Sequence, residues 1–149
     1  VLNHYNKLVT VDEIKKDTKT VWYTYKGRDI GMTSPDYIAS ALTKNGIPAK
    51  IEYKNMDVLK HYISEDKPCI VLLRSGESLW HYVVVYGFTD EKVLIANPSN
   101  GIFQEMTEDT FRRCWNWECD MSGDVMSNGH IGLLLNILEV YPQTLIMPE

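Results

Sequence analysis

His81 is the residue in this sequence whose position best suits proton chemistry. It stands directly before the apolar run 82–88, which has the composition of a β-strand, and directly after the loop 74–80. A strand end holds a side chain rigidly beside a loop, and imidazole is the side chain that exchanges a proton near neutral pH. The competing interpretation is a structural histidine packed at the strand end. Position alone gives the two interpretations equal weight.

Asn97 is the second candidate, because it ends the next apolar run, 92–96, sixteen residues after His81. If the two runs pair as a hairpin, the amide oxygen of Asn97 can accept the imidazole N–H. That bond fixes the tautomer and leaves the other ring nitrogen as a base. The two residues would then form the base and orienting half of a nucleophilic triad. The competing role for Asn97 is that of a turn residue before Pro98.

The register of this hairpin decides whether the two side chains meet. A tight two-residue turn at 90–91 sets His81 opposite Asn100 and turns Asn97 to the other face of the sheet, because side chains alternate between faces. A bulge at Gly87, or a turn of odd length, moves Asn97 to the face of His81. Glycine inside an apolar strand is a plausible bulge site. We therefore expect Asn97 as the partner, with Asn100 as the alternative.

The elements that position these residues follow from capping and turn signals. Thr10 and Glu13 form the T-x-x-E pattern of a capping box, and Ser34-Pro35 marks a second helix start. The expected helices cover residues 10–17, 34–45, 55–63 and 107–115. The expected strands cover residues 47–53, 69–73, 81–88, 92–96 and 101–106. Helices followed by an antiparallel sheet predict an α+β fold.

Composition narrows the functional classes. The net charge of -5 and the absence of a lysine or arginine cluster argue against a nucleic-acid partner. The longest apolar run, 131–135, ends at Asn136 and is much shorter than the roughly 20 residues of a membrane span. The three cysteines form neither a disulfide framework nor a CxxC metal clip.

The length of 149 residues predicts a single domain covering 1–149. Residues 1–5 have the character of a last helical turn, so we expect the domain to start inside its first helix. Residues 120–149 are expected to be a C-terminal extension, in which 133–141 covers part of the core.

Other titratable and aromatic residues are weaker candidates. His4, His61 and His130 share no ligand spacing with cysteines or carboxylates, which disfavours a zinc site, and no cofactor is expected. Trp80, beside His81, is a candidate for lining a substrate cleft. Simple packing at the strand start is the competing role for this indole.

Five segments, in order and spacing, resemble a known family. They are GMTSP (31–35), ALTKNG (41–46), KPCIVLL (67–73), HYVVVYG (81–87) and ANP (96–98). Together they resemble papain-like cysteine peptidases of the bacteriocin-processing type, the double-glycine leader peptidases, and their stand-alone relatives. The resemblance covers roughly residues 1–117. It implies the papain-like fold, with N-terminal helices packed on an antiparallel sheet.

The resemblance implies a catalytic triad of which this sequence holds two members. His81 matches the general base, and Asn97 before Pro98 matches the orienting residue, where the leader peptidases usually carry Asp and papain carries Asn. The family nucleophile is a Cys at the start of a long helix, with a Gln just before it. That position falls about two turns upstream of the segment that aligns with residues 1–5.

No cysteine of the sequence takes the place of this nucleophile. Cys69 lies inside an apolar strand and is expected in the core, while Cys114 and Cys119 flank two tryptophans far along the chain. The chain as given is therefore expected to have no peptidase activity.

The resemblance favours three functions. The first is peptide-bond hydrolysis through a Cys-His-Asn triad in the complete protein, with a peptide or protein as substrate. The second is an inactive peptidase-like domain that binds a peptide or leader segment. The third is transfer of the acyl group to an amine. A transporter partner follows by analogy alone.

Overall fold

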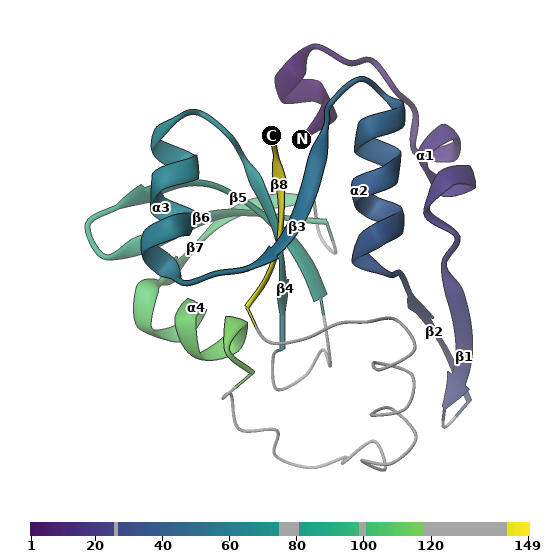
Figure 1. Ribbon diagram of the computed structural model, residues 1–149. Helices are drawn as coiled ribbons and strands as arrows, with labels where there is room; N and C mark the ends of the chain where they lie inside the picture. Colours follow the sequence, from purple (N-terminus) through teal and green to yellow (C-terminus); the bar gives the residue numbers. More distant parts are fainter. Residues whose placement is uncertain (26, 75–80, 99–100, 118–142) are drawn as a thin grey trace.

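The computed structural model of the protein describes residues 1–25, 27–74, 81–98, 101–117 and 143–149 (Figure 1). Its helices are η1 (Leu2–Tyr5, a 3-10 helix), α1 (Val11–Thr18), α2 (Pro35–Lys44), α3 (Met56–Ser64) and α4 (Glu108–Trp115). Its strands are β1 (Val21–Tyr25), β2 (Arg28–Met32), β3 (Ala49–Tyr53), β4 (Cys69–Leu73), β5 (His81–Thr89), β6 (Lys92–Asn97), β7 (Ile102–Thr107) and β8 (Thr144–Pro148).

Six of the strands form one antiparallel sheet in the order β3-β8-β4-β5-β6-β7, and β1 and β2 form a separate hairpin. In Figure 1 the helices α3 and α4 lie on one side of the sheet, and α1 and α2 lie on the other. Helices packed on an antiparallel sheet confirm the α+β fold class predicted from the sequence.

Polar caps begin the helices where the sequence predicts them. At α1 the Glu13 N–H donates to Thr10 Oγ1 at 3.3 Å, and the Thr10 N–H donates to Glu13 Oε2 at 2.7 Å, which completes the capping box. The side chains of Ser34, Asn55 and Thr107 likewise accept an N–H from the first turn of α2, α3 and α4. These bonds satisfy backbone donors that a helix start leaves without partners.

The last strand is an element that the sequence did not predict. All five residues of β8 are buried, and the strand lies between β3 and β4 inside the sheet. Of the expected extension 120–149, the structure describes residues 143–149, and the proposed covering segment 133–141 lies outside the described residues. A fully buried strand lacks the alternating pattern of polar and apolar residues, so a short apolar run gave no clear strand signal.

The main hydrophobic core lies between the sheet and the helices α3 and α4. Its fully buried members come from both layers: Leu59, Cys69, Val71, Val83, Val85, Val93, Ile95, Phe111, Trp115, Leu145 and Met147. A smaller cluster lies on the opposite side of the sheet, where α2 packs, and is formed by Ala39, Leu42, Ile47 and Ile146. The larger core stiffens the strands β5 and β6, which carry the two candidate residues.

Candidate active site

The hairpin β5–β6 closes through a two-residue turn, one of the two alternatives that the sequence left open. Thr89 pairs with Lys92, and the two residues between them, Asp90 and Glu91, have φ angles of 36° and 64°. Two successive left-handed residues are typical of the type I′ turn, whose twist suits a hairpin.

A β-bulge changes the register in the middle of the hairpin. Val85 pairs with Ile95, but the next pair is Gly87 with Leu94, so one extra residue of β5 is accommodated between them. Upstream of the bulge, Val84 pairs with Ala96; one residue further, Asn97 lies opposite Val83, which shares a face with His81. The bulge predicted at Gly87 is therefore confirmed, and it places Asn97 on the same face as His81.

His81 and Asn97 are in direct contact. Nε2 of His81 lies 2.6 Å from Oδ1 of Asn97, and both residues are half-buried. An amide oxygen only accepts hydrogen bonds, so Nε2 must carry the proton and donate it. In the neutral ring Nδ1 then holds the lone pair, and Nδ1 is the atom that can act as a base. The contact predicted between these residues is confirmed, while Asn100 and Trp80 lie outside the described residues.

The strand of His81 is anchored on its other side by β4. His81 pairs with Leu73, the last residue of β4, and Leu73 is only 5% exposed. The next residue, Arg74, donates its N–H to the carbonyl of Cys114 in α4 at 3.0 Å. Strand pairing and this helix contact therefore hold the backbone beside the imidazole in place.

Tyr82 connects this strand to the opposite layer of the molecule. Its hydroxyl donates to the carbonyl of Thr33 at 2.8 Å, directly before the N-cap of α2. Burial raises the pKa of Tyr82, and the nearby Asp36 carboxylate and Tyr53 hydroxyl add to the rise. Tyr82 was not identifiable from the sequence, because a tyrosine in an apolar run carries no sign of a contact 49 residues away.

The described cysteines do not have the properties of a nucleophile. Cys69 is fully buried and donates from Sγ to the Lys67 carbonyl at 3.3 Å, and burial raises the pKa of its thiol to about 12. A reactive cysteine needs the opposite, an accessible thiol of lowered pKa. Cys114 is also buried, at 5% exposure, and Cys119 lies outside the described residues. The core position expected for Cys69 is confirmed.

Neither a metal site nor a membrane-spanning helix is found in the part of the chain that the structure describes. No group of three or more His, Cys, Asp or Glu residues is arranged there to hold a metal ion. None of the described helices has the length and apolar character needed to span a membrane.

Comparisons with known proteins agree with this architecture. The sequence model of the Peptidase C39 family matches residues 1–119. A crystal structure of the peptidase domain of Streptococcus ComA, a bi-functional ABC transporter involved in a quorum sensing pathway, matches with a TM-score of 0.62. That match has 19% sequence identity and covers 99% of this chain and 83% of the ComA chain. A search of curated proteins finds no match.

Proposed function

Because the chain belongs to the Peptidase C39 family, we propose that it is a cysteine peptidase domain in which His81 is the general base and Asn97 orients it. The observation that carries the proposal is the 2.6 Å contact between His81 Nε2 and Asn97 Oδ1. An imidazole held in one tautomer by an amide is the arrangement that activates a thiol in cysteine peptidases.

The proposed nucleophile is a cysteine upstream of Val1 in the complete protein. Nδ1 of His81 would take the thiol proton, and the thiolate would attack the peptide carbonyl. The imidazolium would then protonate the leaving amine, and water activated by the same nitrogen would release the acyl group from sulfur. In this cycle Asn97 keeps the ring from rotating and accepts from Nε2 throughout.

The proposed substrate is a peptide or a protein with a leader segment. This proposal rests on family membership and on the likeness to the ComA peptidase domain, which is part of an ABC transporter. A link of this chain to a transporter is proposed on the same likeness.

A second candidate function is a domain that binds a peptide without cleaving it. Cys69 and Cys114 are buried, so neither described thiol is suited to attack a carbonyl, and both candidates are consistent with this burial. The two candidate functions differ in whether the nucleophilic cysteine is present, so the sequence upstream of Val1 distinguishes them. A cysteine preceded by a glutamine, about two helical turns before Val1, supports the peptidase; another residue at that position supports the binding domain.

Thiol labelling of the longer protein tests the role of His81. We expect an iodoacetamide-reactive cysteine at neutral pH in the wild type, and a loss of peptidase activity of about 10²- to 10⁴-fold in His81→Ala. His61→Ala is the matched control, because the His61 side chain is 67% exposed in α3 and should leave activity unchanged. Equal labelling and equal activity in wild type and His81→Ala would show that His81 is not the base.

Substitution of Asn97 tests the orienting role separately. Asn97→Ala should lower kcat with little change in KM, because the ring loses its orientation while the cleft remains. Asn97→Asp should keep most of the activity, since a carboxylate oxygen can accept the same Nε2 proton. Equal losses in the two variants would contradict an orienting role for the residue 97 side chain.

A further inference from the structure

Strand β3 forms one edge of the six-stranded sheet in the part of the chain that the structure describes. Among the described residues β3 pairs with β8 alone, and in Figure 1 it lies at the front of the sheet between α2 and α3. An edge strand presents backbone N–H and C=O groups that another strand can bind.

The hydrogen bonds at both ends of β3 show which residues face the open edge. The Glu149 N–H donates to the Pro48 carbonyl at 2.8 Å, and the Lys54 N–H donates to the Gln143 carbonyl at 3.3 Å. Alternate residues of an antiparallel strand direct their backbone groups to the same neighbour. The even-numbered residues 48–54 therefore face β8, and the odd-numbered residues, with Ile51 at the centre, face outward.

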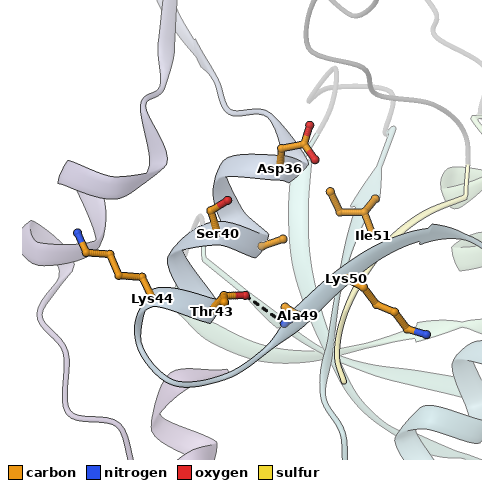
Figure 2. Close-up of a pocket in the computed structure, with 8 residues that line it drawn as sticks. Asp36, Ser40, Thr43, Lys44, Ala49, Lys50 and Ile51 are labelled. Carbon is orange, nitrogen blue, oxygen red and sulfur yellow. Dashed lines mark hydrogen bonds between the residues drawn. The ribbon is translucent and has the colours of Figure 1, made fainter.

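A groove runs along this edge between α2 and β3. It has a volume of ≈ 650 Å³, and Figure 2 shows Asp36, Ser40 and Thr43 on its α2 side and Ala49 and Ile51 on its β3 side. The Ala49 N–H donates across it to Thr43 Oγ1 at 3.3 Å, the dashed line in Figure 2. The small side chain of Ala49 leaves space at this end of the groove.

The other end of β3 carries a large aromatic side chain on the same face as Ala49. Tyr53 is four residues further along the strand, and 48% of its surface is exposed. Lys50 and Glu52 lie on the opposite face, toward α3, where Lys50 contacts Tyr62. Both faces of β3 therefore carry side chains that can contact a second strand, Tyr53 on one face and Lys50 and Glu52 on the other.

We propose that two copies of this chain pair antiparallel through β3, around a two-fold axis at Ile51. The N–H and C=O of Ile51 then bond to the same groups of the second copy, while the Ala49 N–H stays bonded to Thr43 Oγ1 of its own chain. The pairing sets Tyr53 of each copy opposite Ala49 of the other, so that the tyrosine ring enters the groove beside α2. It also sets Lys50 of each copy opposite Glu52 of the other.

The charge pattern is what selects a second copy as the occupant. Lys50 and Glu52 form an ion pair of 2.9 Å within one chain, and their side chains are 39% and 27% exposed. Glu52 also forms an ion pair of 3.2 Å with Lys54 of its own chain. Because the strand is its own partner in a two-fold interface, Lys50 and Glu52 of each chain supply two complementary cross-strand pairs. An unrelated extended peptide has no reason to match both the charges and the tyrosine.

Sedimentation velocity of this chain tests the proposal without any assay of peptidase activity. The wild type should reach twice the monomer mass of 17.2 kDa as its concentration rises to hundreds of micromolar. Lys50→Glu sets like charges opposite each other at two places and should weaken the dimer about tenfold or more. Glu52→Lys should do the same.

Combining the two charge-reversed variants tests whether the strands pair in this particular register. An equimolar mixture of Lys50→Glu and Glu52→Lys chains should form heterodimers, and the double variant should regain the wild-type mass. Tyr53→Ala should weaken the dimer while the far-ultraviolet circular dichroism stays unchanged. A monomer at every concentration, or charge-swapped chains that fail to recombine, would overturn the proposal, as would a wild type that stays monomeric and binds an extended peptide instead.

The opposite edge of the sheet supplies the matched control. Lys92 and Glu105 form an ion pair of 3.1 Å between β6 and β7, with 49% and 53% exposed side chains. Lys92→Glu changes the net charge as Lys50→Glu does and should leave the dimer mass unchanged. Loss of the dimer in Lys92→Glu would assign the interface to β7 and overturn the pairing through β3.

Discussion

The two faces of the six-stranded sheet are buried to different extents. On the face toward α3 and α4, the residues Val83, Val85, Val93 and Ile95 are at most 2% exposed. On the face toward α2, the neighbouring residues Tyr82, Val84, Leu94 and Ala96 are only half-buried, and Tyr86 and Phe103 are 41% and 71% exposed. The rings of Tyr86 and Phe103 meet edge to face at 5.4 Å on this open side.

The difference shows where the candidate site obtains its rigidity. The face toward α3 and α4 is the closed face of the sheet. His81 and Asn97 follow the register of Val83, so they lie on this closed face, just beyond the buried valines of the hairpin. Tyr82 points the other way and bonds to Thr33. The fully packed core on the closed face therefore fixes the position of the imidazole. The neighbouring Tyr82 connects the same strand to the start of α2 through its bond to Thr33.

Substitution of Trp115 should have the largest effect on stability, because this residue packs in the core on the closed face of the sheet. Its side chain is fully buried and donates from Nε1 to the Thr144 carbonyl at 2.9 Å. Trp115→Ala should lower the free energy of unfolding by about 3–5 kcal/mol in urea denaturation. Trp22→Ala is the control, because Trp22 is 69% exposed, and its effect should stay within about 0.5 kcal/mol. Similar losses in the two variants would contradict the burial difference.

Val84 and Val85 compare the two faces at adjacent positions of β5. Val85 is fully buried toward α3 and α4, and Val84 is half-buried on the other side. Val85→Ala should cost about 2 kcal/mol and Val84→Ala less than about 1 kcal/mol, measured by urea denaturation of the two variants side by side. A larger cost at Val84 would mean that this face is also closed.

The thiol of Cys69 predicts a pH dependence from the closed face. Its pKa is about 12 in the folded protein against 9.0 ordinarily, so above pH 9.0 the unfolded chain releases a proton that the folded chain keeps. The free energy of unfolding should therefore fall as pH rises through this window, by about 1.4 kcal/mol at one pH unit above the ordinary pKa. Cys69→Val should flatten this fall between pH 9 and 10, and parallel curves for the two proteins would contradict it.

Phe103 provides the smallest expected effect. Phe103→Ser removes an aromatic ring that is 71% exposed, so the free energy of unfolding should change by less than about 0.5 kcal/mol. Urea denaturation of this chain measures it, with Phe111→Ser, in the closed core, as the destabilised comparison. A loss above about 1 kcal/mol at Phe103 would show that the open face contributes to stability.

Most of the elements followed from local signals in the sequence. Thr10 with Glu13, Ser34 and Asn55 began helices as expected, because a side-chain oxygen near free backbone donors acts over three residues at most. The strands β4, β5 and β6 were predicted within a residue of their ends, since continuous apolar runs bounded by turn residues are short-range patterns. The buried strand β8 was missed because its position in the sheet depends on partners about 75 to 100 residues earlier.

For the candidate site, the sequence determined the residue types and the tertiary structure decided their meeting. His81, Gly87 and Asn97 were identifiable along the chain, and so were the two alternative registers of the hairpin. The choice between Asn97 and Asn100 depended on a one-residue bulge, whose place is set by packing of both strands against α3 and α4. The link from Tyr82 to Thr33, and the open edge of β3, exist only after distant segments have packed, because no local pattern encodes a contact between them.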